Sequence, residues 1–105
     1  MKPYYEDDLV TLYLGSCVFQ PEKPDEPVVD AWLQAEVLVT DPPYGMAFLS
    51  GQRKGEKLAR IAGDEDTVVR DRALARWGSE RAALVFGRWS VTAPAGERQR
   101  LIWAK

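Results

Sequence analysis

Residues 36–44 read Glu36-Val37-Leu38-Val39-Thr40-Asp41-Pro42-Pro43-Tyr44, an apolar run that ends in an acid, two prolines and an aromatic residue. Proline has a fixed φ and no backbone N–H, so neither Pro42 nor Pro43 can extend a sheet ladder. The strand predicted over 36–40 therefore ends at Asp41. In open α/β sheets, ligands bind at the carboxyl ends of the strands. We therefore expect the chemistry of this chain at residues 41–44.

The two prolines stiffen this turn and leave hydrogen-bond acceptors in it. They hold the backbone without needing partners for two amides, and the carbonyls of Asp41 and Pro42 can accept hydrogen bonds. The Asp41 carboxylate adds two more acceptor oxygens, and Tyr44 adds an aromatic face. Such a cluster suits a flat ligand that carries an amino group, because the N–H groups bond to the oxygens while the ring stacks on the tyrosine.

In this setting, Asp-Pro-Pro-Tyr resembles the catalytic motif of the DNA methyltransferases that modify exocyclic amines, N6 of adenine or N4 of cytosine. Two other segments agree: Leu9 to Cys17 is similar to the strand and Gly-Asp-Cys turn that open such enzymes, and Arg100 to Lys105 resembles a later strand. The segment from Asp64 to Trp89 resembles small methylases carried by actinobacterial phages. The resemblance covers nearly the whole chain.

The resemblance implies transfer of a methyl group from S-adenosylmethionine to the amine of a base that is flipped out of the duplex. Asp41 would hold the amine through a hydrogen bond that localises its lone pair, and Pro42 would contribute its carbonyl. Pro43 would set the turn, and Tyr44 would stack on the flipped base. Neither a metal nor a covalent nucleophile is required.

The glycine turn with which this family holds its cofactor is missing. That turn normally reads Phe-x-Gly-x-Gly, and none of the 8 glycines here occurs as Gly-x-Gly. Gly15 and Ser16 are the candidate cofactor contacts, although relatives usually carry an acid at the position of Ser16. We therefore expect the N-terminal half of such an enzyme, shortened or split, and inactive as an isolated chain. The alternative is an inactive, methylase-derived phage binding module that engages DNA or a host protein.

The charge balance limits how the chain can bind DNA. It has 14 Lys and Arg against 16 Asp and Glu, a net charge of −2, which argues against a strong non-specific hold on phosphates. DNA binding would use local contacts, either in the basic loop after the motif or at the end of a later strand. The candidates are Arg53, Lys54, Lys57, Arg60, Arg88 and Trp89. For the loop, the alternative is a solvated charge run, and for the last two residues it is a cap on the core.

The residue types present exclude several kinds of site. With one cysteine and no histidine, the chain cannot form an internal disulfide, a His-dependent triad or the usual zinc site. The sequence has no charged n-region followed by an apolar run, and no apolar stretch long enough to span a bilayer. We therefore expect a cytoplasmic protein, and the resemblance to phage methylases implies that a phage encodes it and that it acts in a bacterial host.

Strands and helices are predicted to alternate within a single truncated methyltransferase-like domain, 1–105, divided into 1–20, a Pro-rich linker over 21–27, and 28–105. The predicted strands are 9–13, 36–40, 82–86 and 101–103; helices are predicted over 28–35 and 64–77, a long loop over 45–63, and a turn over 94–97. Strands joined through helices imply parallel crossovers. The predicted fold class is α/β, a partial Rossmann-like methyltransferase sheet of about four mainly parallel strands with helices on its faces, in which 82–86 is buried on both sides. A homodimer or a partner chain would cover its open edge.

Overall fold

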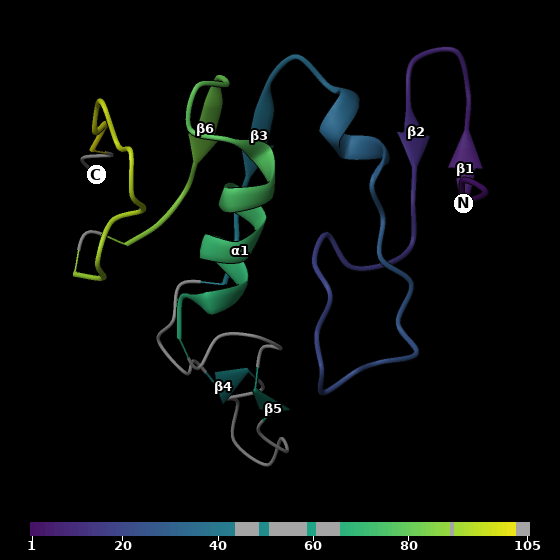
Figure 1. Ribbon diagram of the computed structural model, residues 1–105, viewed down its shortest axis with the longest axis horizontal. Coiled ribbons are helices and arrows are strands. Elements are labelled where there is room, and N and C mark those ends of the chain that lie inside the picture. The colour runs from purple at the N-terminus through teal and green to yellow at the C-terminus, as the bar shows by residue number, and fades with distance from the viewer. Residues whose placement is uncertain (44–48, 51–58, 61–65, 89, 103–105) are drawn as a thin grey trace. The chain divides into compact units, whose positions relative to one another are not determined.

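A computed structural model describes residues 1–43, 49–50, 59–60, 66–88 and 90–102 (Figure 1). The chain divides into two compact units, Met1–Glu36 and Val37–Lys105. The predicted α/β sheet of about four strands is wrong, since the strands described form three separate two-stranded sheets. One of the three is parallel and the other two are antiparallel.

The first unit begins with an antiparallel hairpin, in which β1 (Tyr5–Glu6) pairs with β2 (Thr11–Leu12). Its turn is held by Asp7, whose Oδ1 accepts hydrogen bonds from the backbone N–H groups of Leu9 and Val10, both at 2.8 Å. Aspartate commonly stabilises turns in this way. The strand predicted over 9–13 is therefore confined to β2, and it pairs with the residues just before it instead of joining a parallel sheet.

A backbone bridge closes the rest of the first unit. The Ser16 N–H donates to the Pro27 carbonyl, and the Val29 N–H donates to the Ser16 carbonyl, both at 2.8 Å. Ser16 and Val28 are thereby paired in parallel. Because the β-branched residues Val28 and Val29 are used in this bridge, the helix predicted over 28–35 shortens to one 3₁₀ turn, η1 (Ala31–Gln34).

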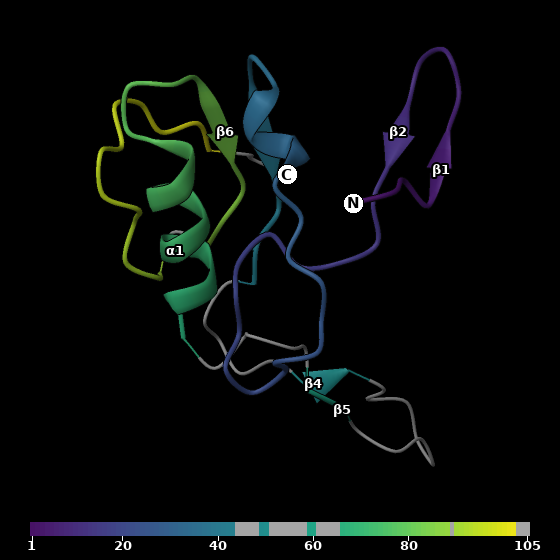
Figure 2. The same cartoon turned by 45° about the vertical axis from the view of Figure 1, so that its right-hand side comes forward.

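The second unit is built on one β–α–β crossover. The strands β3 (Leu38–Thr40) and β6 (Ala83–Val85) pair in parallel, and α1 (Val68–Trp77) lies between them in the chain. Figure 1 shows α1 alongside this pair, and Figure 2 shows α1 next to β6. Parallel neighbours need a crossover of this kind. The predicted parallel crossover is confirmed for these two strands.

The helix α1 ends where the sequence predicts, but it begins later than residue 64. Asp66 precedes the helix, and its Oδ1 accepts a hydrogen bond from the Val68 N–H at 2.9 Å. This carboxylate therefore satisfies a backbone donor of the first turn without being part of the helix. Residues 64–65 lie outside the described part of the chain. The helix ends at Trp77, and Gly78 follows with φ of 102°, a conformation that favours glycine.

Trp77 is the most important core residue of this helix. It is 2% exposed, so its side chain belongs to the core. The guanidinium of Arg81 lies 3.6 Å from the centroid of its ring, a cation–π contact. Ala73 and Val69, one and two turns before Trp77 on the same stripe, are half-buried, so the face of the helix that carries Trp77 is the one that packs.

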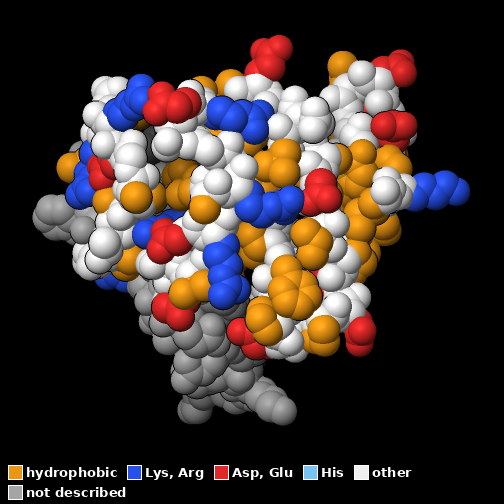
Figure 3. All heavy atoms as spheres, in the orientation of Figure 1, with side chains coloured by type: hydrophobic (Ala, Val, Ile, Leu, Met, Phe, Trp, Pro, Cys, Tyr) orange, Lys and Arg blue, Asp and Glu red, His pale blue; other side chains and the backbone are white. Residues whose placement is uncertain are grey.

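One face of the β3–β6 pair remains exposed. Leu38 and Thr40 are half-buried, whereas Val39 points to the opposite face and is 64% exposed. Leu84 pairs with Val39 and is 45% exposed. The prediction that the strand over 82–86 is buried on both faces is therefore wrong, because α1 is the only helix among the described residues of this unit. Figure 3 shows hydrophobic side chains at the surface among charged ones.

The remaining elements are short. The antiparallel pair β4 (Leu49–Ser50) and β5 (Ala59–Arg60) falls within the predicted loop over 45–63, the rest of which lies outside the described residues. Gly96 has φ of 84°, in agreement with the predicted turn over 94–97. Residues 101–102 are exposed and belong to no strand, contrary to prediction, because no described strand pairs with them. In the described part of the chain, no helix is long and apolar enough to cross a membrane.

Candidate functional site

The predicted motif begins directly after β3. Thr40 is the last residue of the strand, and its carbonyl accepts a hydrogen bond from the Phe86 N–H at 2.9 Å. Asp41 is exposed, and Pro42 and Pro43 are half-buried. The strand therefore ends where the prolines predict. Tyr44 lies outside the described residues, so its stacking role stays a prediction.

The parallel pairing brings a second segment to the same edge of the sheet. Because β3 and β6 run in the same direction, the residues that follow the two strands share one edge. Gly87 and Arg88 follow β6, and Arg88 is exposed there. Asp41 supplies acceptor oxygens at this edge, and Arg88 supplies a guanidinium, which is a donor for phosphate. The edge thus combines one group suited to an amine with one suited to a phosphate.

Arg70 is a buried arginine that bonds to the backbone of Thr92, which follows Arg88 in the chain. Its side chain is 7% exposed, and its Nη1 donates to the carbonyl of Thr92 at 2.8 Å. Its Nε donates to Oδ1 of Asp71 at 2.9 Å, and the Thr67 hydroxyl donates to the other oxygen of Asp71 at 2.8 Å. A buried charge needs such partners. Sequence reasoning missed this residue, because an arginine beside an aspartate on a helix usually indicates a solvated surface pair.

The predicted cofactor contacts Gly15 and Ser16 lie in the first unit, where the structure gives them a packing role. A Cβ on Gly15 would lie 2.6 Å from the Pro27 carbonyl oxygen, so the space that a glycine might leave for a ligand is filled by backbone. The hydroxyl of Ser16 accepts hydrogen bonds from the Val18 N–H at 3.3 Å and from Nε2 of Gln20 at 3.1 Å. This turn does not fit a cofactor, because the hydroxyl and backbone groups of Ser16 are already hydrogen-bonded to residues of the same unit.

The predicted DNA contacts are only partly described. Arg88 lies at the edge that carries Asp41, and Arg60 lies in β5, opposite Leu49. The other four calls, Arg53, Lys54, Lys57 and Trp89, fall outside the described residues and stay predictions.

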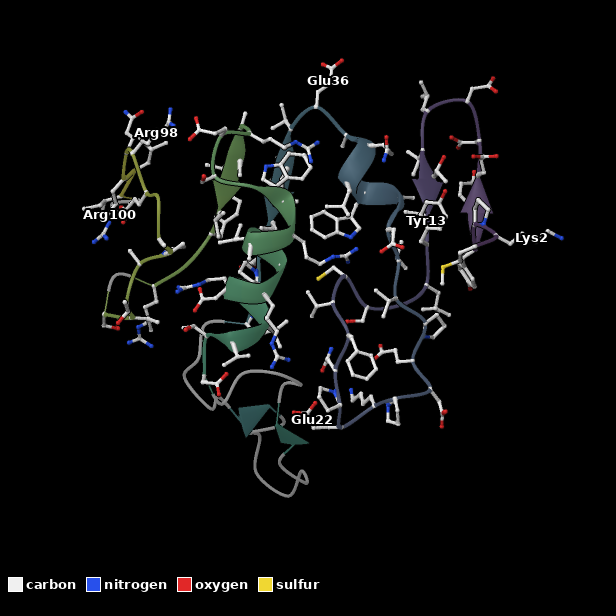
Figure 4. All side chains as sticks on the ribbon, viewed as in Figure 1. Lys2, Tyr13, Glu22, Glu36, Arg98 and Arg100 are labelled. Atoms are coloured by element: carbon white, nitrogen blue, oxygen red, sulfur yellow. The ribbon has the colours of Figure 1, made fainter. Side chains whose placement is uncertain are left out.

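Two other arginines lie in the C-terminal segment of the second unit. Arg100 donates two hydrogen bonds to the Glu97 carboxylate, at 2.7 and 2.9 Å. Arg98 pairs with Glu80 at 3.4 Å, and both arginines are exposed. Figure 4 shows their side chains on the yellow segment, away from α1. Exposed pairs of this kind contribute little to stability.

The edge of β3 and β6 therefore holds the acceptor oxygens of Asp41 and the donor groups of Arg88. Both groups are in place from backbone pairing within the second unit. Comparisons of this chain with protein-family models, with curated proteins and with solved structures gave no match.

Proposed function

We propose that this chain carries the base-amine site of an S-adenosylmethionine-dependent DNA methyltransferase that modifies N6 of adenine or N4 of cytosine. The observation that carries the proposal is the position of Asp41-Pro42-Pro43, at the carboxyl end of a parallel strand and at the same sheet edge as Arg88. Carboxyl edges of parallel strands are where α/β proteins bind their ligands. The resemblance of the motif to that of the amino-methyltransferases supplies the ligand class.

In this function, two acceptors hold one amine. The Asp41 carboxylate accepts one N–H of the flipped base and the Pro42 carbonyl accepts the other, so the lone pair is drawn out of the ring and localised on the nitrogen. The base must leave the stack first, because its amine is unreachable inside a duplex. The prolines keep both acceptors in place before the base arrives, which lowers the entropy lost on binding.

The proposal concerns the amine side of the reaction. S-adenosylmethionine supplies the methyl group when it is bound, but the Gly15–Ser16 turn does not fit it, for the reasons given above. We therefore assign no residue of this chain to the methyl donor.

The same observation favours a second function, an inactive methylase-derived binding module that engages DNA or a host protein. Such a module would keep the acceptors at Asp41 and bind a base without transferring a methyl group. For a module that engages DNA, the two functions agree on base binding and differ only in transfer.

Base binding is tested with oligonucleotides that differ only in the amine. The affinity of the full chain for single-stranded DNA containing adenine is compared with that for the same strand containing purine, and cytosine is compared with pyrimidin-2-one, by fluorescence anisotropy. We expect about tenfold weaker binding without the amine in one pair, about 1.4 kcal/mol, near the low end for a hydrogen bond to a charged group because Asp41 is exposed.

Two variants make this test specific. Asp41→Ala should remove the difference between the two strands, whereas Asp8→Ala, which removes an exposed acid of the first unit, should keep it. Equal affinity of the wild-type chain for both members of each pair would refute the base-amine site. Transfer of label from S-adenosylmethionine to DNA then separates the two functions, and any transfer that survives Asp41→Ala contradicts the role of that residue.

A further inference from the structure

Arg70 is a buried arginine that the proposed function does not yet use. Its guanidinium makes bonds in two directions: Nη1 donates to the Thr92 carbonyl at 2.8 Å, while Nε and Nη2 both lie 2.9 Å from Oδ1 of Asp71. The planar guanidinium fixes the directions of these donors relative to one another. Arg70 therefore links the first turn of α1 to the backbone of Thr92, which lies 22 positions later in the chain.

The segment after β6 is held at both of its ends. At one end the Phe86 N–H donates to the Thr40 carbonyl of β3 at 2.9 Å, and at the other the Thr92 carbonyl is bound by Arg70. Between these anchors, the Val91 N–H donates to the Arg88 carbonyl at 3.0 Å. The exposed side chain of Arg88 thus projects from a short segment with fixed ends.

We propose that Arg70 is a positioning residue that, through the backbone of Thr92, holds Arg88 at the edge of the sheet to bind the phosphate beside the target base. This inference rests on the proposed function, because it takes the nucleotide bound at Asp41 as the source of the phosphate. An anchored segment loses less conformational entropy when Arg88 binds than a free one would. Arg70 itself is too buried to contact a phosphate, so its effect on binding must pass through Arg88.

The salt dependence of DNA binding tests this coupling. The full chain is titrated against a fluorescein-labelled single-stranded oligonucleotide at several salt concentrations, and the slope of log K against log [salt] is measured. Each phosphate contact contributes about 0.7 to that slope for single strands. Arg88→Met should therefore lower the slope by about 0.7. Arg70→Met should lower it by about the same amount, and the double variant should show no further loss.

A purely structural role for Arg70 would lower the thermal midpoint and leave the slope of the folded protein unchanged. If Arg70→Met unfolds, Arg70→Lys takes its place, since one ammonium group cannot hold Asp71 and Thr92 in the geometry of the guanidinium. Arg98→Met is the matched control. It removes an exposed arginine from the C-terminal segment, away from α1, and should keep the wild-type slope (Figure 4).

Three results would overturn the inference: a wild-type slope in a folded Arg70 variant, additive losses in the double variant, or a wild-type slope in Arg88→Met. Its failure is distinguishable from failure of the proposed function, because the two are measured differently. Equal affinity for adenine and purine, and for cytosine and pyrimidin-2-one, refutes the base-amine site at Asp41. An unchanged slope of log K against log [salt] refutes the phosphate contact of Arg88.

Discussion

Gly15→Ala adds one methyl group at a point where two backbone segments meet. The new Cβ would lie 2.6 Å from the Pro27 carbonyl oxygen and 2.8 Å from Cγ2 of Val29. Both separations are below van der Waals contact, and the oxygen belongs to the backbone, so it cannot rotate aside. Val29 is buried, so its side chain has little room to move. The two segments must therefore separate.

The expected cost follows from two opposing effects. Forcing an extra methyl group into a packed site costs about 1–3 kcal/mol. Replacing glycine by alanine also stiffens the unfolded chain, which stabilises the folded state by about 0.4–1 kcal/mol. The clash is the larger effect, because it acts on the bridge that Ser16 forms with Pro27 and Val29. We expect a net loss of about 1–2 kcal/mol in the local stability of the bridge, roughly a 5- to 30-fold larger open population.

Amide hydrogen exchange measures this directly at the N–H groups of Ser16 and Val29, which close the bridge. Both should exchange roughly 5- to 30-fold faster in Gly15→Ala. Gly87→Ala is the matched control, since a Cβ at Gly87 would meet nothing within 4 Å, and we expect a change within about 0.5 kcal/mol. Unchanged exchange at Ser16 and Val29 in the Gly15 variant would refute the packing argument.

Two further predictions concern the core of the second unit and the hairpin of the first. Trp77→Ala should destabilise the protein by about 3–5 kcal/mol in denaturant titrations, since the side chain is 2% exposed. The control Leu101→Ala removes an exposed side chain and should be nearly neutral. Equal effects of the two substitutions would contradict the core assignment of Trp77. Asp7 has a pKa below its ordinary value of 3.8, mainly because it accepts the Leu9 N–H and then the Tyr5 hydroxyl. Its stabilisation of the hairpin is therefore present above pH 3.8 and lost as the pH falls through the lower folded pKa. In an NMR titration, the chemical shift of the Leu9 amide should report the loss of its hydrogen bond as Asp7 is protonated. Asp7→Asn should abolish that pH dependence. A pKa of 3.8 for the Asp7 carboxyl would contradict the assigned hydrogen bonds.

The ends of two elements could be predicted from the sequence, because each depends on the backbone of one or two residues. Pro42 and Pro43 cannot extend a ladder, and β3 ends at Thr40. Gly78 tolerates a φ of 102°, and α1 ends at Trp77. The place of Asp41 directly after β3 follows from the same local rules, whereas its role as a site residue stays a prediction.

The size of the sheet could not be predicted in this way, because pairing depends on residues elsewhere in the chain. The apolar run over 9–13 is typical of a sheet strand, but the side chain of Asp7 turns it back onto β1. The apolar residues of β6 are typical of a strand between two layers, yet Leu84 is exposed because one helix covers one face. Whether a second layer exists is a property of the whole fold.

The two units make the packing and cofactor interpretations of Gly15 separable by experiment. The pairing that positions Asp41 joins residues of the second unit, whereas Gly15 packs against Pro27 in the first. If Gly15 has a packing role, Gly15→Ala speeds exchange at Ser16 and leaves the preference for an amine-bearing base intact. If Gly15 contacts a cofactor, the same variant lowers methyl transfer while exchange at Ser16 stays at the wild-type rate. The 2.6 Å approach to a backbone oxygen favours the first outcome, because a ligand cannot occupy space that the chain already fills.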